Sequence, residues 1–524
     1  MNGALQAGFS MFGERYASTT GNWLYRLGKK THRYHSRERM VSPDYREILI
    51  LTVTEWITGR ISENPRRGYY MKRSFQILAI LALMAIAGAR PAAAQNRYIV
   101  RTTGGLNSVL NLCLSAGCQV QGSLDGPVGQ TFLVTSTQNL LVTLVNVALN
   151  LVESLLGIQS VEADHLLPIP QRTMSTIPPG LNDNAPVNYY GTVVWHGYAA
   201  QPAAQIIRLG DAQAGFKVSG TGIVAVIDTG VDTSHPVLVA VLLPGYDFTR
   251  NQPGASEWLD VPLLNGTTSQ TNETQQPVIV QQSSAAILDQ SSAAILDGGP
   301  YSAFGHGTMT TGLVHLAAPK AKILPLKAFT SNGTGYLSNI IAALYYAVQH
   351  QANVVNMSFD VSSPSAALNQ AVAYANKNGV VLVAAAGNES TSAPVYPAAL
   401  NGNVMGIAST TDWDQRSSFS NYGSTDVWIA APGEYVISTF PGGTYASASG
   451  TSFSSPLVAG TAALLLQAKP SLHQAGAASA FSHAVQLTPD LNHGRLDAYQ
   501  AVSAWINSTS SSSGSTSSCS LLCL

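Results

Sequence analysis

An aspartate, a histidine and a serine far apart in this 524-residue chain each lie in surroundings that suit hydrolytic chemistry. Asp228 directly follows the apolar run 223–227, which predicts a carboxylate at the carboxyl end of a buried strand, where open α/β sheets form their sites. His306 lies between Gly305 and Gly307, so the backbone can approach closely while the ring stays accessible. A carboxylate, an imidazole and a hydroxyl are the groups that nucleophilic acyl transfer needs.

The serine candidate is Ser452, which follows Gly450 and opens an apolar helical pattern over 452–467. The positive end of a helix would favour a developing oxyanion beside its hydroxyl and backbone N–H. A helix cap is the competing interpretation of this serine. Asn388 ends the apolar run 380–384 through Gly387, and its amide can donate to the same oxyanion, although Asn388-Glu389-Ser390 also has the form of a glycosylation acceptor.

Other readings of the same residues are weaker. Asp228-Thr229-Gly230 is also the signature triplet of aspartic proteases, but that chemistry needs a second such acid, and the sequence has no second triplet. Asp232 lies past the glycine turn with no strand before it, and His315 fits a core position among apolar neighbours. His306 taken alone could also be structural.

The elements that must position these residues alternate regularly. Apolar runs typical of buried strands alternate with helical patterns, which predicts an α/β fold with a parallel sheet and helices on both faces. The expected strands are 223–227, 323–326, 354–355, 380–384, 404–407 and 427–430, and the expected helices are 338–350, 366–378 and 452–467.

The segment before this region has its own pattern. Strands near 97–101, 119–120, 132–134 and 158–169, with helices over 106–115 and 140–156, give the order βαββαβ. That order predicts a small ferredoxin-like α+β domain over 95–170.

The N-terminal end has the features of a secretory signal. A basic start at Met71-Lys72-Arg73 precedes an apolar run over 75–89 and a small-residue site at 92–94, which predicts a signal peptide over 71–94 and a secreted protein, extracellular or periplasmic. Residues 1–70 are richer in charge, and we interpret them as a non-native or cytoplasmic extension, with translation starting at Met71. The alternative is a true cytoplasmic tail with an uncleaved anchor.

Composition marks three further segments. Residues 171–204 contain Pro, Asn and Gly with little periodicity, which predicts a linker holding the processing site before a catalytic domain over 205–506. The octapeptide 282–289 repeats at 290–297 within a polar stretch, and we interpret it as a duplicated surface loop, with a substrate exosite as the alternative. The Ser-rich end, 507–524, predicts a flexible tail.

The ordered set of motifs resembles the subtilisin family. The chain order is Asp, His, Ser, with GHGT at 305–308, AAAGN at 384–388, and GTS at 450–452 followed by SP and VAG. The likeness covers about 205–505 and includes GTGY at 333–336, NVVNMSF at 353–359 and APG at 431–433. Residues 95–170, ending in SVEAD, are similar to the inhibitory propeptide of that family.

The resemblance implies a role for each residue. Asp228 would orient the imidazole, His306 would act as base and then acid, Ser452 would attack the peptide carbonyl, and Asn388 with the Ser452 N–H would bind the oxyanion. It also implies substrate contacts at Gly333, Gly335, Ser358, Phe359, Asp360, Ala385 and Gly387. Two departures stand out: Asp360 replaces a family glycine, which puts the substrate preference in doubt, and Leu457 replaces a histidine, which we expect to affect packing only.

These observations define the expected partners. We expect polypeptide substrates, the chain's own prodomain as an intramolecular inhibitor, a monomer, and no stable membrane anchor after signal cleavage. A formal charge of −1 with 10% charged residues and no long basic run argues against nucleic acid. The chemistry needs no cofactor and no catalytic metal, while structural calcium is possible. A catalytically silent relative that only binds, and a processing peptidase of narrow specificity, are the alternative functions.

Overall fold

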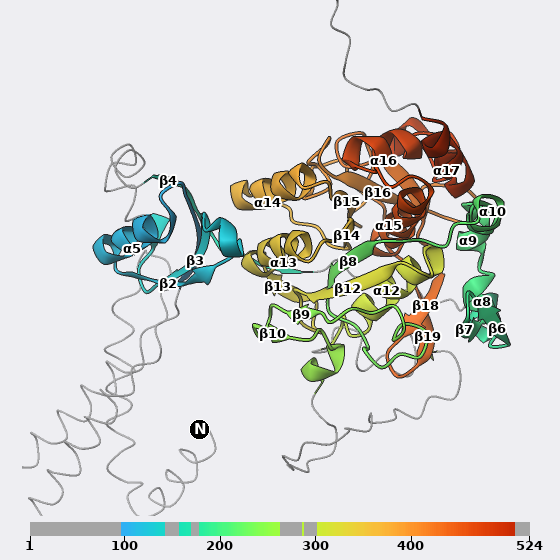
Figure 1. The fold of residues 1–524 in the computed structure, drawn as a ribbon, viewed down its shortest axis with the longest axis horizontal. Helices are drawn as coiled ribbons and strands as arrows, with labels where there is room; N and C mark the ends of the chain where they lie inside the picture. Colours follow the sequence, from blue (N-terminus) through green and yellow to red (C-terminus); the bar gives the residue numbers. More distant parts are fainter. Residues whose placement is uncertain (1–95, 142–156, 169–177, 262–285, 288–300, 509–524) are drawn as a thin grey trace, which may run out of the picture. The chain divides into compact units, whose positions relative to one another are not determined.

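Five stretches of the chain are described in this computed structural model: 96–141, 157–168, 178–261, 286–287 and 301–508 (Figure 1). The expected extension 1–70, the signal peptide 71–94 and the tail beyond 508 lie outside them, as does most of the repeat at 282–297. Within the described stretches no helix combines the length and the apolar character that a membrane span requires.

The central feature is an eight-stranded sheet in the order β10-β9-β12-β8-β14-β15-β16-β17. All neighbouring strands pair in parallel except β10 with β9. The strands are β8 (Ile223–Asp228), β9 (Tyr246–Asp247), β10 (Gln252–Pro253), β12 (Lys322–Lys327), β14 (Val354–Met357), β15 (Val381–Ala385), β16 (Met405–Thr410) and β17 (Ile429–Pro432). The six predicted strands are all present, because each is an apolar run buried on both sides.

Helices cover both faces of this sheet (Figure 1). Val224 and Val226 of β8 belong to the apolar cluster of one face, whereas Ala225 and Ile227 belong to the cluster of the other, as the alternation of side chains along a strand requires. The first face packs against α12 (His306–Ala317), α15 (Thr451–Ala468), α16 (Gln474–Phe481) and α17 (Ala498–Asn507), and the second against α13 (Leu337–Gln349) and α14 (Ala366–Lys377). The predicted α/β class is therefore confirmed.

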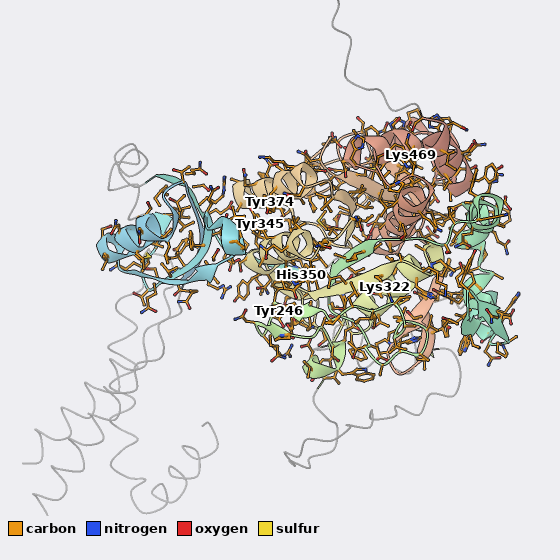
Figure 2. All side chains as sticks on the ribbon, in the orientation of Figure 1. Tyr246, Lys322, Tyr345, His350, Tyr374 and Lys469 are labelled. Atoms are coloured by element: carbon orange, nitrogen blue, oxygen red, sulfur yellow. A yellow bond between two sulfur atoms is a disulfide. The ribbon has the colours of Figure 1, made fainter. Side chains whose placement is uncertain are left out.

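The second face is compact because its two helices pack directly on each other. The rings of Tyr345 in α13 and Tyr374 in α14 lie 5.0 Å apart between centroids (Figure 2). Contacts of this kind add to the area that the aromatic side chains bury. These two helices also carry the contacts with the N-terminal region described below.

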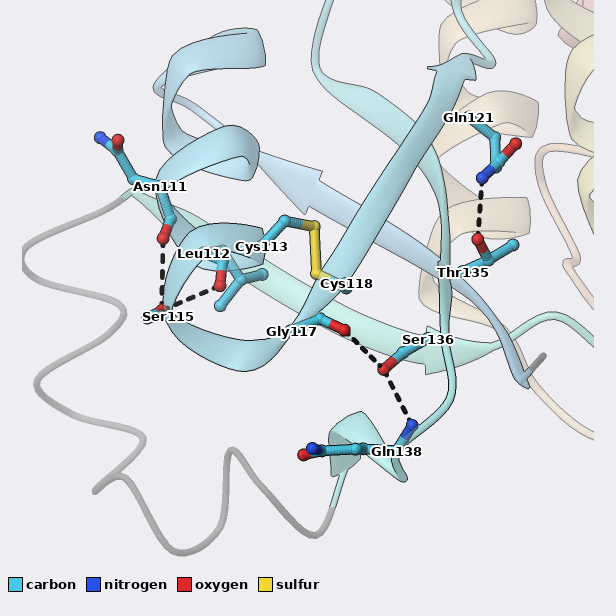
Figure 3. The surroundings of a disulfide bond; sticks show 10 residues. All are labelled: Asn111, Leu112, Cys113, Ser115, Gly117, Cys118, Gln121, Thr135, Ser136 and Gln138. Atoms are coloured by element: carbon cyan, nitrogen blue, oxygen red, sulfur yellow. Dashed lines mark hydrogen bonds between the residues drawn. A yellow bond between two sulfur atoms is a disulfide. The ribbon is translucent and has the colours of Figure 1, made fainter. Parts of the chain in front are cut away.

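Residues 96–168 form a smaller unit around a four-stranded antiparallel sheet in the order β2-β3-β1-β4. Its elements are β1 (Asn96–Thr102), α5 (Gly105–Ala116), β2 (Cys118–Ser123), β3 (Thr131–Ser136) and β4 (Ile158–Ala163), followed by β5 (Leu166–Pro168). A disulfide between Cys113 and Cys118 ties the end of α5 to the start of β2 (Figure 3). The second expected helix, 140–156, lies almost wholly outside the described residues, so the complete ferredoxin-like arrangement stays a prediction.

The structure differs from the linker expected over 171–204. From residue 178 onward the chain is folded, with η2 (Pro179–Asn182), the hairpin β6 (Pro186–Tyr189) and β7 (Thr192–Trp195), α8 (His196–Ala199) and α9 (Pro202–Ile206), followed by α10 (Leu209–Phe216). Leu181 and Tyr198 are fully buried in the core of the first face. These elements are too short to show periodicity, and their burial comes from distant residues such as Gly312, whose carbonyl accepts from the Tyr198 hydroxyl at 2.6 Å.

A hairpin of β18 (Val436–Phe440) and β19 (Thr444–Ala448) leads into α15. The backbone of β11 (Ala286–Ile287), which falls in the first copy of the repeat, pairs in parallel with β19. The other residues of the repeat, 282–285 and 288–297, lie outside the described stretches.

Candidate active site

The carboxylate of Asp228 and the ring of His306 meet at the end of β8 and the beginning of α12. His306 Nδ1 lies 2.7 Å from Asp228 Oδ1, and Thr310 Oγ1 donates to Asp228 Oδ2 at 3.0 Å. A third bond comes from the backbone N–H of Thr229, 2.7 Å from Oδ1. Because a carboxylate accepts only, the proton of the neutral ring is held at Nδ1, and Nε2 is left as the basic nitrogen.

The surroundings adjust the basicity of this histidine. Burial disfavours the imidazolium, but the negative charge and the hydrogen bond of Asp228 outweigh it, so the pKa of His306 is raised above 6.5. Its Nε2 atom is buried and has no hydrogen-bond partner among the residues that the structure describes. A buried basic nitrogen without a partner can accept a proton from a group that approaches it.

Ser452 lies in the first turn of α15, directly after Thr451. Its hydroxyl donates to the carbonyl of Ser358 at 3.1 Å rather than to His306. The His306 ring lies 5.4 Å, between centroids, from the ring of Phe453, the residue that follows Ser452. The histidine and the serine helix are therefore neighbours, and rotation about the serine χ1 selects among staggered positions for the hydroxyl.

Asn388 follows β15 and is anchored to the start of the same helix. Its Oδ1 accepts from the backbone N–H of Thr451 at 2.9 Å and from Thr451 Oγ1 at 3.0 Å. These bonds fix the orientation of the amide and leave its N–H donors for other groups. A β-carbon at Gly450 would lie 3.4 Å from Asn388 Nδ2, so the amide nitrogen faces the loop that delivers Ser452.

Glu257, which no sequence motif indicated, is a fully buried acid next to the Asp228–His306 pair. Its carboxylate accepts from Thr308 Oγ1 at 2.6 Å, from the backbone N–H of Gly307 at 3.1 Å, and from Thr229 Oγ1. It thus joins the residue after Asp228 to the residues after His306. Burial raises the pKa of Glu257 to about 7, although the two threonine hydroxyls oppose the shift. Nothing in its local sequence marks this role.

A buried lysine lies next to this acid. Lys327 is fully buried, and its Nζ donates to the carbonyls of Thr229 at 2.6 Å and Phe329 at 2.7 Å, and to Asp260 Oδ2 at 2.6 Å. These bonds tie the loop after β8 to the end of β12.

The seven expected substrate residues occupy three segments. Gly335 lies in β13 (Thr334–Tyr336), and Gly333 precedes it with φ of 79°, a conformation that favours glycine. Ser358 is joined to α15, because its Oγ lies 2.9 Å from the Ser452 carbonyl, and the ring of the next residue, Phe359, packs 5.2 Å from that of Phe329. Ala385 ends β15, Gly387 has φ of 97°, and Asp360 lies in the segment that follows β14.

The competing residues have structural partners. Asp232 accepts from Ser234 and from the backbone N–H of Gly442. His315 lies 3.1 Å from the Tyr198 hydroxyl, and burial lowers its pKa to about 3, which keeps it neutral in the core. Leu457 is fully buried in the packed helix α15. No group of three or more His, Cys, Asp or Glu side chains in the described stretches is placed to hold a metal ion.

Comparison with known proteins identifies the class. Residues 220–509, more than half of the chain, match the sequence model of the peptidase S8 group, described as the subtilase family. The chain therefore belongs to the subtilase family, and it is a serine endopeptidase of the subtilisin type.

Three relatives show the extent of the similarity. Thermitase of Thermoactinomyces vulgaris is 35% identical over 287 residues, which is 53% of this chain and 88% of that protein. The thermophilic serine proteinase of Bacillus sp. (strain AK1) is 34% identical over 53% of this chain and 61% of its own length. Subtilisin BL of Lederbergia lenta is 42% identical over 32% of this chain and 65% of its own length.

Proposed function

We propose that this peptidase is made as a secreted, self-processing precursor and cleaves polypeptides through Asp228, His306 and Ser452. The observation that carries the proposal is the 2.7 Å bond between His306 Nδ1 and Asp228, which leaves an unpartnered Nε2 beside the helix that bears Ser452. Intact residues at all these positions argue against a silent relative that only binds.

The reaction follows from the protonation states. His306 Nε2 takes the hydroxyl proton of Ser452 as Oγ bonds to the carbonyl carbon, and Asp228 stabilises the resulting imidazolium. The imidazolium then gives the proton to the leaving amine as the C–N bond breaks, which forms an acyl-enzyme and releases the C-terminal product. Water, deprotonated by the same nitrogen, attacks the ester and releases the second product, with Ser452 restored.

The oxyanion of each tetrahedral intermediate would be stabilised by preorganised donors. Asn388 Nδ2 and the backbone N–H of Ser452 are the proposed pair, because the bonds from Thr451 hold the amide oriented toward this loop. The start of α15 adds the partial positive charge of a helix terminus.

The N-terminal unit is the proposed inhibitor, because its last strand pairs where a peptide substrate would bind. β5 lies antiparallel to β13, with Leu167 opposite Gly335 and Pro168 opposite Thr334. Leu167 is buried in the same cluster as Phe329 and Phe359. Addition of an extended strand to an exposed edge is a general mode of peptide recognition, and it supports both the substrate orientation and the inhibition.

Two carboxylates of this unit cap helices of the catalytic region. Glu162 accepts from the backbone N–H of Ala367 at 2.9 Å and from that of Ala366 at 3.2 Å, at the start of α14. Asp164 accepts from the N–H and the hydroxyl of Ser338, each at 2.8 Å, at the start of α13. Unpaired N–H groups and the helix dipole favour anions there, which supports a tightly held prodomain.

Replacing Ser452 by Ala tests the nucleophile and the processing together. The variant is expected to lose peptidase activity by several orders of magnitude and to accumulate as an unprocessed precursor, because no other group can form the acyl-enzyme. Electrophoresis and mass measurement of the purified chain check this. A Ser452→Ala protein that still matures when purified alone would exclude Ser452. Ser482→Ala is the matched control. The Ser482 hydroxyl only donates to the nearby Ser479 carbonyl, so this variant should mature normally.

The pH profile tests the base. His306 must be neutral to accept the proton, so kcat/KM should rise with pH through its raised pKa, with the midpoint above 6.5. Because the Glu257 carboxylate also raises this pKa, Glu257→Gln should move the midpoint to lower pH. A flat profile from about pH 5 to 9 would contradict the assignment of His306.

Secretion is proposed from the signal-like sequence at 71–94. N-terminal sequencing of exported protein tests it, and an exported chain that retains residues 1–70 would contradict it.

A further inference from the structure

Asp360 is the acid that stands where the resemblance expects a glycine, and it follows closely on a residue that the nucleophile contacts. It is two residues beyond Ser358, whose carbonyl accepts from the Ser452 hydroxyl. The intervening residue, Phe359, turns its ring toward Phe329 in the core of the second face.

The register of the sheet places Asp360 beside the residues that follow β15. β14 and β15 are adjacent and parallel, with Met357 opposite Ala384, so the chain segments after them leave the same edge of the sheet. The position of Asp360 is fixed by its neighbour Val361, which exchanges backbone hydrogen bonds of 2.7 and 2.8 Å with Tyr396. The chain at Asp360 therefore leaves the sheet at the same edge as Ala385 and Gly387, two further expected substrate residues.

The side chain of Asp360 has acidic neighbours, and it forms no ion pair within the described stretches. Its Oδ2 atom is buried and has no hydrogen-bond partner among the described residues. Burial, together with the carboxylates of Glu389 and Asp426, raises the pKa of Asp360 to about 7. Each of those two neighbours has at least one partner, since Glu389 Oε2 accepts from Asn421 Nδ2 at 2.9 Å and Asp426 Oδ1 from the Val395 N–H at 3.1 Å. Asp426 Oδ2, like Asp360 Oδ2, has no hydrogen-bond partner among the described residues.

A buried carboxylate without a partner is costly, and the cost is relieved when a cation binds it. A metal ion is a poor candidate, because these three acids are not among any group of side chains placed to hold one in the described stretches. A lysine ammonium or an arginine guanidinium brings both the charge and the N–H donors that a carboxylate accepts.

We propose that Asp360 selects substrates with lysine or arginine as the residue whose carbonyl Ser452 attacks. This inference rests on the proposed catalytic function of Ser452. An apolar side chain at that substrate position would bury the Asp360 carboxylate further without pairing it, so the acid both attracts cations and rejects apolar residues.

Matched peptides test the selectivity. Four peptides that differ only at the residue before the cleaved bond, with Arg, Lys, citrulline or Phe, are compared by kcat/KM on the purified mature enzyme. Citrulline has nearly the shape of arginine without its charge. We expect Arg and Lys to exceed citrulline and Phe by about 10- to 100-fold, the factor that corresponds to a hydrogen bond with a charged group. A wild-type preference for Phe, or equal rates for Arg and citrulline, would overturn the inference.

Variants assign the effect to one carboxylate. Asp360→Asn should reduce the ratio of Arg to citrulline to near 1, whereas Glu389→Gln, which removes a neighbouring exposed carboxylate, should change it by a few-fold at most. If the ratio of Arg to citrulline fell equally in both variants, the summed negative charge of the region would act instead of Asp360 alone. That result would contradict the proposal. Active-site titration with a serine-directed inhibitor corrects each rate for the fraction of folded enzyme.

The two hypotheses fail in different ways. If Ser452 is not the nucleophile, the serine-directed inhibitor labels a different residue or none, whichever peptides are cleaved. If only the role of Asp360 is wrong, peptides are cleaved and Ser452 is labelled, but the residue before the cleaved bond is not cationic.

Self-processing of the purified precursor gives a second readout. Between Asp164 and His196 the sequence contains one arginine and no lysine, Arg172. The inferred preference therefore predicts that the matured chain begins at Thr173, and N-terminal sequencing measures this. A mature N-terminus that follows an apolar residue would count against the inference.

Discussion

The catalytic region and the N-terminal unit reach stability by different means. The catalytic region, 178–508 without its undescribed loop, has a large apolar cluster on each face of an eight-stranded sheet, and no cysteine lies between 119 and 518. The N-terminal unit has one small cluster and one disulfide. Small domains bury too little apolar surface to be very stable alone, and cross-links commonly compensate.

The outer face of the smaller unit shows the same contrast. Leu106, Leu110 and Leu114 of α5 are 48%, 43% and 84% exposed, whereas every residue of α12 in the catalytic region is buried. The small unit is held instead at its other side, through Glu162, Asp164 and the pairing of β5 with β13. The difference suggests that the catalytic region stands alone, while the N-terminal unit depends on its partner and its cross-link.

The largest effect on stability is expected inside the catalytic region. Lys327→Met should lower the free energy of unfolding by about 3 to 5 kcal/mol, because two buried carbonyls lose their donor and Asp260 loses one of its two cationic partners, with Arg250 remaining. Denaturant titration in the Ser452→Ala background, which avoids self-digestion, measures this. Lys322→Met on the same strand is the control, because that side chain is exposed, and it should change stability by less than about 0.5 kcal/mol. If Lys327→Met and Lys322→Met lost similar amounts of stability, burial of Lys327 would not explain the effect.

A smaller effect is expected at the contact between the two regions. Asp164→Asn should weaken the attachment of the N-terminal unit by about 2 kcal/mol, because a fully buried carboxylate loses charge-assisted bonds to Ser338 and Arg97. In the Ser452→Ala precursor an added protease should then remove the unit faster. Asp211→Asn, at an exposed carboxylate of α10, is the control. Unchanged removal would mean that the capping bonds do not hold the unit.

An effect of similar size, confined to the N-terminal unit, is expected from the disulfide. Replacing Cys113 and Cys118 by Ser should destabilise the N-terminal unit by about 2 kcal/mol, since the cross-link closes a short loop. The unfolding of the catalytic region should not change. If both regions lose stability together, the contrast between them is wrong.

The fold was predictable where the residue pattern of a single segment indicates its secondary structure. The run 223–227 is apolar and β-branched, and it becomes β8, while the apolar helical pattern over 452–467 becomes α15, which begins directly after Gly450. Glu257 was not predictable, because its partners, Thr229 and Thr308, are 28 and 51 residues away in the sequence. Likewise Tyr198 is buried by residues more than 100 positions later, so its segment was mistaken for a linker.

In the candidate site, too, contacts between residues far apart in the sequence could not be predicted. The sequence identified Asp360 as a departure from the family pattern, but only the structure brings Glu389 and Asp426 to it. The hydroxyl orientation of Ser452 was also not predictable, since its acceptor, the Ser358 carbonyl, lies 94 residues away.

Mapping the residue modified by a serine-directed phosphonylating inhibitor tests the central claim most directly. The account predicts one modified residue, Ser452, with labelling that rises as His306 loses its proton and that falls to background in His306→Ala. Modification of any other serine, or labelling of Ser452 that does not depend on His306, would contradict the assignment.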